Sequence, residues 1–159
     1  MEIDWEKHHH YMPWAGACGP TVIKMIFSVA DIKKSILEIS LYTWKWWYGC
    51  PNQLFSAYLS KFFSLTNYKL NGSIADISRH LKMGHIVVVN FWDNTDGHYA
   101  IISECKKGIL TVIDPSRERE WRYTIATKEF KKIWYDYLDT INTIYHEGLL
   151  IWVDVNSKR

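Results

Sequence analysis

The first half of the chain carries apolar residues at the three-to-four-residue spacing of a helix face. The spacing is clearest in PTVIKMIFSVA, where Pro20 also suits a first helical turn because its missing N–H has no partner there. Asp31 and Ser73 precede two further periodic segments and are typical N-caps, and Gly84 is a typical C-terminal stop. We therefore expect helices over residues 20–30, 32–42, 51–63 and 74–83.

After Gly84 the pattern changes to β-branched and aromatic runs separated by turn residues, which is typical of strands. One later helix, capped by Thr127, is expected over residues 128–138. Helices first and an antiparallel sheet second define an α+β fold, and we expect residues 1–159 to form a single domain. The predicted strands cover residues 85–92, 98–104, 108–114, 121–125 and 148–155, with CKKG at 105–108 as a tight hairpin turn.

Composition narrows the class of protein. With 159 residues, of which 48% are hydrophobic, the chain can bury one ordinary core. A net charge of +2 without a Lys/Arg block gives no reason to expect nucleic acid, and no apolar run approaches the roughly 18 residues of a membrane span. The three cysteines, Cys18, Cys50 and Cys105, are far apart, and the N-terminus lacks an apolar signal core, so we expect a cytoplasmic protein.

A histidine and an aspartate flank the predicted hairpin. If the turn centres close to Lys106 and Lys107, His98 and Asp114 lie eight residues to either side of Lys106. Residues equidistant from a hairpin turn face each other with Cβ atoms about 5 Å apart, so we expect His98 and Asp114 to be neighbours at one end of the sheet, to within one residue of register. Asp114 can then accept a hydrogen bond from one imidazole nitrogen and leave the other to take a proton. The spacing therefore predicts a base and the group that orients it.

Cys18 supplies a nucleophile for such a base. It lies just before the helix predicted at Pro20, where the helix dipole favours a thiolate. Taken singly, a buried cysteine is commonly a core residue, and a His–Asp pair is commonly structural. The combination of a thiol at a helix start, a histidine at a strand start and an aspartate at the end of the partner strand favours a triad of Cys18, His98 and Asp114.

The segments ACGPTVIKMI, ISRHLKMGHIVVVNF, DGHYAIISE and VIDPS resemble, in order and spacing, the papain-like cysteine peptidases of the double-glycine leader-peptidase group and its free-standing relatives. The resemblance spans nearly the whole chain. It implies a papain-like fold, with an N-terminal helical part packed on a C-terminal antiparallel sheet. It also implies hydrolysis of a peptide or protein substrate through a thioester, without a cofactor. In that scheme Cys18 is the nucleophile, His98 the general base and acid, and Asp114 the orienting residue.

The chain departs from this family pattern at the oxyanion hole. The family places a glutamine about six residues before the cysteine, whereas this chain has Met12 near that place and no glutamine in residues 8–17. Loss of one oxyanion donor typically lowers the rate about 10²–10³-fold. We therefore expect Trp14 or His10 to supply the donor, with Tyr11 as a less favoured choice.

Two further features have open interpretations. In the loop TWKWWYGC, Trp44, Trp46 and Trp47 either wall an apolar substrate groove or pack the helices against the sheet. His8–His10 predict an exposed polar arm, and we expect no metal site, with these histidines and Cys18 as the metal-binding alternative. The functional alternatives to a peptidase are another acyl transfer, of the amidase or transglutaminase type, and a non-catalytic domain that binds peptides.

Overall fold

The computed structural model describes residues 2–46, 48–137 and 144–159. Helices come first along the chain and an antiparallel sheet follows, so the predicted α+β class is confirmed. In chain order the elements are α1 (Trp5–His8), α2 (Cys18–Val29), α3 (Ile36–Thr43), α4 (Asn52–Ser60), β1 (Thr66–Lys69), α5 (Ile74–Lys82), β2 (Ile86–Trp92), β3 (Gly97–Lys106), β4 (Ile109–Ile113), β5 (Arg122–Ala126), α6 (Thr127–Ile133), β6 (Tyr135–Tyr137), β7 (Ile144–Glu147), β8 (Leu150–Val153) and η1 (Val155–Ser157).

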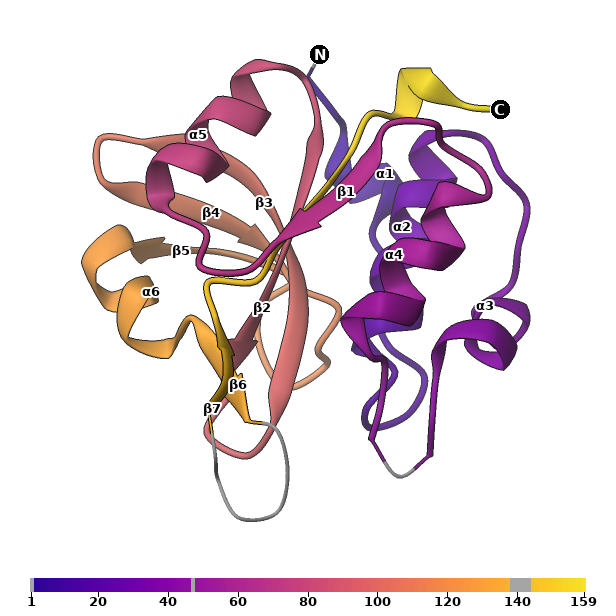
Figure 1. The fold of residues 1–159 in the computed structure, drawn as a ribbon, viewed down its shortest axis with the longest axis horizontal. Helices are drawn as coiled ribbons and strands as arrows, with labels where there is room; N and C mark the ends of the chain where they lie inside the picture. Colours follow the sequence, from indigo (N-terminus) through magenta and orange to yellow (C-terminus); the bar gives the residue numbers. More distant parts are fainter. Residues whose placement is uncertain (1, 47, 138–143) are drawn as a thin grey trace.

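A six-stranded antiparallel sheet in the order β1-β8-β2-β3-β4-β5 forms the centre of the molecule. Helices α2 and α4 cover one face of the sheet, and α5 and α6 cover the other (Figure 1). The short pair β6–β7 packs beside β2 and β3. Helices α2 and α4 therefore meet the sheet across one broad interface, whereas α5, also from the helical first half, packs on the opposite face.

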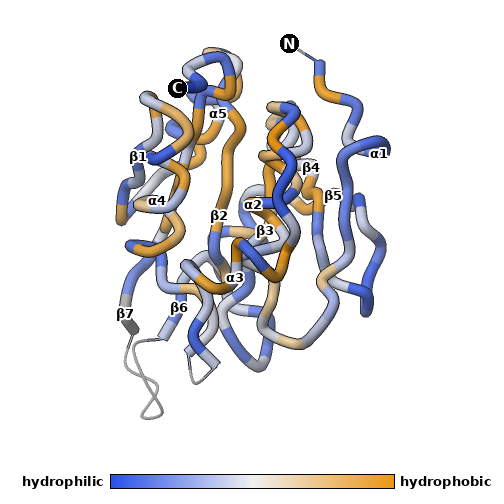
Figure 2. Tube along the Cα trace, turned by 90° about the vertical axis from the view of Figure 1, so that its right-hand side faces the viewer, coloured by the Kyte–Doolittle hydropathy of each residue, from blue (hydrophilic) through white to orange (hydrophobic). Residues whose placement is uncertain are grey.

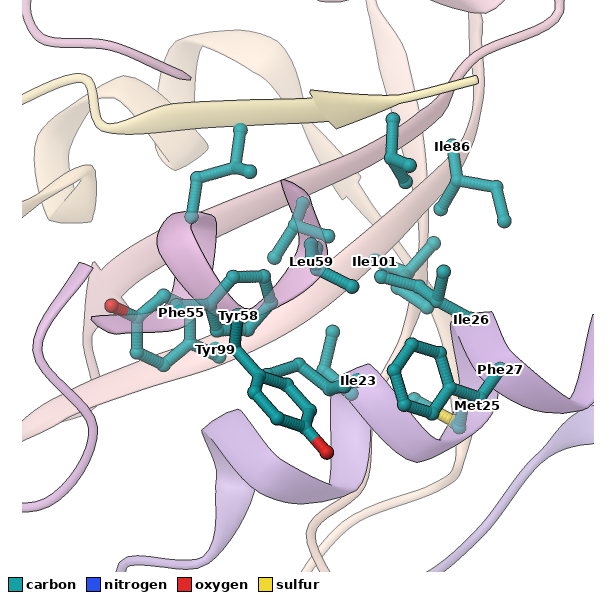
Figure 3. Close-up of a cluster of buried hydrophobic side chains, with 14 of the residues drawn as sticks. Ile23, Met25, Ile26, Phe27, Phe55, Tyr58, Leu59, Ile86, Tyr99 and Ile101 are labelled. Carbon is teal, nitrogen blue, oxygen red and sulfur yellow. The ribbon is translucent and has the colours of Figure 1, made fainter. Parts of the chain in front are cut away.

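Strand β2 is buried along nearly its whole length because both faces of the sheet are covered. Ile86 and Val88 belong to the core cluster shared with α2 and α4, whereas Val87 and Val89 belong to the cluster under α5 and α6. The strand therefore begins with four apolar residues in a row instead of alternating, before the buried polar Asn90, and this first part appears as a hydrophobic stretch in Figure 2. Figure 3 shows the first cluster, with Ile23, Ile26 and Phe27 from α2, Phe55 and Leu59 from α4, and Tyr99 and Ile101 from β3.

The predicted helix boundaries are confirmed at one cap and wrong at another. Ser73 caps α5 as predicted, because its hydroxyl accepts from the Asp76 N–H while the Asp76 carboxylate accepts from the Ser73 N–H. Gly84 ends that helix at a φ of 80°. Asp31 caps nothing, since its φ of 53° lies outside the extended conformation of an N-cap. Helix α3 begins only after Ser35, whose side chain caps it.

The helix predicted over residues 128–138 is shorter in the structure. Helix α6 starts at Thr127, the residue expected as its cap, and ends at Ile133. Trp134 then anchors the chain in the core, because its indole N–H donates to the Leu149 carbonyl oxygen at 3.0 Å. Strand β6 follows at once, and the end of the predicted helical range lies outside the described residues.

Five elements of the described residues have no counterpart in the sequence-based prediction. They are α1, β1, β6, β7 and η1, and each is only three or four residues long. Periodicity needs a longer window to distinguish a strand from a helix, so segments of this length leave no clear pattern. Among the helices of the described residues, none has both the length and the apolar character that crossing a bilayer requires.

Candidate active site

Cys18 is the first residue of α2 and is buried. The next residue, Gly19, lies directly against Cys50, and a Cβ at Gly19 would come within 2.7 Å of the Cys50 sulfur. The helix start can therefore dock here only because Gly19 has no side chain. Since the first amides of a helix have no intrahelical acceptor, the Cys18 thiol lies at the positive end of the helix dipole.

The turn between β3 and β4 lies one residue later than the sequence predicts. Lys107 and Gly108 form this two-residue turn, and both have positive φ values, 50° and 77°, as a type I′ turn requires. Counted from this turn, His98 and Asp114 are not equidistant, so the predicted direct cross-strand pairing of these two residues is wrong. Their side chains still meet, because a bulge in β3 changes the register.

The bulge lies at Ser103, where β3 carries one residue more than β4. Side chains of a strand alternate between the two faces, so one extra residue exchanges the faces beyond it. Beyond the bulge Ile101 pairs with Ile113, so the next position puts Asp114 opposite Ala100. Ala100 is two residues from His98, so the side chains of Asp114 and His98 lie on the same face of the sheet. Without the bulge, Asp114 would lie opposite Ile101, on the other face of the sheet.

His98 is buried, and its ring is held on one side by a carboxylate. Nε2 lies 2.7 Å from Asp114 Oδ1, and the Cys18 side chain lies close enough to the ring to influence its pKa. Burial disfavours the charged ring, but the hydrogen bonds to Asp114 and Cys18 outweigh it and raise the pKa of His98 to about 10. The imidazolium is therefore the main form of His98 at neutral pH.

Asp114 is fully buried, and both of its carboxylate oxygens are engaged. Oδ1 faces His98 and also accepts from the Ser116 N–H at 2.8 Å. Oδ2 accepts from the Tyr123 hydroxyl at 3.0 Å and lies 3.6 Å from Arg119 Nη1. Burial alone would raise the pKa of Asp114, but the hydrogen bond and charge of His98, the Ser116 amide and the Arg119 charge lower it. The carboxylate therefore stays charged and held in one orientation.

Comparison with family models places the chain in a known group. The model described as Peptidase C39 family matches residues 16–143, a range that contains Cys18, His98 and Asp114. The chain belongs to the Peptidase C39 family. This membership confirms the resemblance to the double-glycine leader peptidases and their free-standing relatives.

Two solved structures share the fold of this C39 chain. A double-glycine-motif protease from an AMS/PCAT transporter, solved in complex with the leader peptide, has a TM-score of 0.65 and 10% identity over 91% of this chain and 89% of that chain. A C39-like peptidase from Bacillus anthracis has a TM-score of 0.66 and 12% identity over 96% of each chain. At these identities the likeness concerns the fold, and it confirms the papain-like arrangement. A comparison with curated proteins gives no significant match.

In this C39 chain the segment before Cys18 is bound to the loop after β4. The Met12 N–H donates to the Pro115 carbonyl oxygen at 2.8 Å, and His9 Nε2 lies 2.8 Å from the Asp114 carbonyl oxygen. The three histidines of the segment are half-buried, so the predicted exposed polar arm is wrong. Among the described residues, no three His, Cys, Asp or Glu side chains gather as a metal site would require.

The two candidate oxyanion donors lie in different surroundings. The indole Nε1 of Trp14 is buried and has no hydrogen-bond partner among the described residues, and its ring meets Trp44 edge to face. His10 lies near Lys24, since burial and then the Lys24 charge lower the pKa of His10. Lys24 is six residues along α2 from Cys18, a rise of about 9 Å. Trp14 therefore offers a donor without a partner among the described residues, whereas burial and the Lys24 charge disfavour the charged form of His10.

The aromatic loop after α3 divides into a packed and an exposed part. Trp44 is half-buried, and its indole N–H donates to the Gly16 carbonyl oxygen at 3.0 Å, which ties the loop to the entry of α2. Trp46 is 79% exposed, and Trp47 lies outside the described residues. The contact of Trp44 fits the packing interpretation, and a substrate groove walled by these tryptophans stays a prediction.

Sequence reasoning missed Arg119 and Tyr123, both of which contact Asp114. Arg119 lies in the charged run SRERE, where no pattern distinguishes it from its neighbours. Tyr123 could have been found, because β5 pairs it with Val112, and alternate residues of β4 share a face with Asp114. The register argument used for β3 and β4 would have reached Tyr123 if extended to the next strand.

Proposed function

We propose that this chain is a cysteine peptidase in which Cys18 is the nucleophile. The observation that supports the proposal is the buried ring of His98, which has Asp114 Oδ1 at 2.7 Å from Nε2 and the Cys18 side chain close enough to raise the pKa of the ring. A nucleophile, a base and an orienting group in contact are what nucleophilic catalysis requires. Family membership, and the leader peptide bound to one structural neighbour, support a peptide as the substrate class.

The proposed reaction uses two proton transfers through His98. The Cys18 thiolate attacks the carbonyl carbon of the scissile bond and forms a tetrahedral oxyanion. The intermediate collapses when the imidazolium gives its proton to the leaving amine, which leaves a thioester on Cys18 and a neutral ring. His98 then takes a proton from water as the water oxygen attacks the thioester, and the thiolate is released with the carboxylic acid product. Asp114 fixes the ring orientation and balances its charge.

The oxyanion requires donors about 2.7–3.1 Å from the developing charge. The Cys18 N–H is one such donor, because a helix start leaves its first amides unpaired. The Trp14 indole is the second, which its buried and unpartnered Nε1 supports. His10 is the alternative second donor.

A second candidate function is a domain that binds peptides without cleaving them. The observation that favours it is Met12, which stands near the expected glutamine position, while its own N–H is engaged by Pro115. Methionine has no side-chain N–H or O–H to donate. The two candidate functions therefore differ in whether the oxyanion is stabilised, and not in whether the thiol is reactive.

Selective alkylation tests the reactive thiol. Cys18 is expected to react with iodoacetamide much faster than Cys50 or Cys105 at pH 7, because burial raises the pKa of both other thiols whereas Cys18 lies at a helix start near the charged ring of His98. Mass mapping after brief labelling measures the three rates. His98→Ala should remove the advantage of Cys18. Equal labelling of all three cysteines in the native chain would contradict the proposal.

Hydrolysis of a peptide library, with trapping of an acyl-enzyme on Cys18, then separates the two candidates. Trp14→Phe keeps the bulk of the ring and removes its N–H, so turnover should fall about 10²-fold while alkylation of Cys18 stays fast. His10→Ala tests the alternative donor in the same way. The second oxyanion donor is the residue whose replacement lowers turnover about 10²-fold while alkylation of Cys18 stays fast. Rapid alkylation without hydrolysis of any peptide would favour the binding domain.

A further inference from the structure

Arg119 joins the two loops that lead into and out of the candidate triad. Its Nη1 lies 3.6 Å from Asp114 Oδ2, and its Nη2 is paired with Asp93 Oδ2. Asp93 begins the loop that leads from β2 to His98, and Asp114 begins the loop that follows β4. One guanidinium therefore connects segments that carry two different members of the triad.

The Asp114 carboxylate depends on these contacts because of where it stands in the chain. Strand β4 ends one residue earlier, and the Asp114 backbone is held by its N–H, which donates to the Trp121 carbonyl oxygen at 2.8 Å, and by His9 at its carbonyl oxygen. These backbone contacts leave the direction of the carboxylate to its own partners. Oδ1 is occupied by His98 and the Ser116 amide, and Oδ2 by Tyr123 and Arg119. With donors on both oxygens, the carboxylate cannot rotate without losing a hydrogen bond.

Asp93, which pairs with Arg119, and Tyr123, which contacts the same Asp114 oxygen as Arg119, are themselves held in place. The Asp93 N–H donates to the Asp96 carbonyl oxygen at 2.9 Å, which closes the short loop before β3. Burial, and then the charge of Asp114, raise the pKa of Tyr123, so its hydroxyl stays protonated and donates to Asp114. The Arg119 side chain is itself only 27% exposed, so solvent screens its ion pairs less than those of a surface arginine.

We propose that Arg119 is a positioning residue which, together with Tyr123, holds Asp114 Oδ2 so that Oδ1 faces His98. The inference rests on the proposed peptidase function and adds a residue that acts through Asp114. It places no contact between Arg119 and the substrate.

A double-mutant cycle tests whether Arg119 acts through Asp114. Arg119→Met should lower kcat about 10–100-fold with little change in KM, because a misplaced orienting group costs rate and not binding. In an Asp114→Asn background the same change should cost less than about 2-fold, since the group that it positions is already altered. Arg119→Lys keeps the charge but lacks the planar guanidinium that spans two carboxylates. Its kcat should therefore lie between those of the native chain and of Arg119→Met. Equal factors in both backgrounds would overturn the proposal.

A second measurement does not depend on turnover. The ring N–H proton that His98 shares with Asp114 can be followed by NMR in histidine-labelled protein. Arg119→Met and Tyr123→Phe should shift or broaden this resonance, whereas the matched control Arg122→Met, at an exposed position of β5, should not. If the native protein hydrolyses no peptide, the proposed function fails, and the NMR measurement alone tests the role of Arg119. A shifted resonance in Arg119→Met supports the positioning role, and an unchanged resonance overturns it.

Discussion

At the scale of single residues, Asp136 is an unusual neighbour of the candidate site. Its carboxyl group lies against Gly97, the residue before His98, and it accepts a hydrogen bond from the Tyr137 N–H at 2.8 Å. No ion pair to Asp136 is present among the described residues. Burial, with a further contribution from the charge of Asp96, raises the pKa of Asp136 to about 6. The folded chain therefore carries an unfavourable charge at neutral pH.

Asp136→Asn should stabilise the protein in a pH-dependent way. Because the pKa is raised on folding, the folded state binds the proton more tightly, and that stability is lost as pH rises through about 6. At pH 7.5 the variant should exceed the native free energy of unfolding by about 1–2 kcal/mol, and near pH 4 the two should agree. Urea unfolding at both pH values measures the difference. Glu120→Gln, at an exposed position, is the control, and a gain that is equal at both pH values would contradict the assignment to Asp136.

The contact of His98 with Asp114 could be predicted because both residues flank one hairpin, where sequence separation limits distance. The predicted pairing was still wrong in register, since neither the turn position nor the bulge at Ser103 follows from alternation alone. The contacts of Asp114 with Arg119 and with His9 could not be predicted, because irregular loops and a distant segment set them. Local patterns thus indicated which residues meet, but not how they are held.

At the scale of elements, the docking of α2 explains why glycine follows the cysteine. Gly19→Ala should lower the free energy of unfolding by about 1–3 kcal/mol, because the new methyl group must displace Cys50 or the helix start. Alkylation of Cys18 should slow at the same time, since the thiol moves with the helix end. Denaturant unfolding and labelling rates measure the two effects.

Gly84→Ala is the matched control for this prediction. Its φ of 80° makes alanine unfavourable, but a Cβ there meets no atom within 4 Å. It should therefore lower stability by about 1–2 kcal/mol through backbone strain and leave the Cys18 rate unchanged. A Gly19→Ala protein that alkylates at the native rate would show that the close approach to Cys50 does not position the thiol.

Element types were predicted more successfully than element ends. Long periodic segments gave α2, α4 and α5, and the Ser73 cap was found because its hydroxyl and the Asp76 carboxylate form a local motif. The end of α6 could not be found in the same way, because the indole of Trp134 is held by Leu149, fifteen residues later. Contacts across such separations decide where a helix stops, and single-sequence periodicity does not contain them.

At the scale of the whole molecule, one sheet serves two hydrophobic cores. Ile101 and Ile102 are adjacent on β3, yet Ile101 packs under α2 and α4 while Ile102 packs under α5 and α6. Ile101→Ala and Ile102→Ala should each lower the free energy of unfolding by about 2–5 kcal/mol. Each variant should unfold in a single transition by circular dichroism and tryptophan fluorescence, since neither core can open without the shared sheet.

Ile109→Ala provides the comparison, because that side chain is on the same hairpin but is 47% exposed. It should change stability by less than about 1 kcal/mol. Two separate transitions in either core variant would show that the two layers unfold independently.

The bulge at Ser103 also limits how this hairpin can change during evolution. The residue count between His98 and Asp114 fixes whether the two side chains share a face, so an insertion or deletion of a single residue in the paired strands separates them. Two residues gained together preserve the alternation, as does one residue gained while the bulge is lost. The constraint therefore concerns whether the change in residue number is odd or even, and not the length itself. Relatives that keep both side chains together can differ in hairpin size, but an odd change must be matched by the gain or loss of a bulge in the ladder.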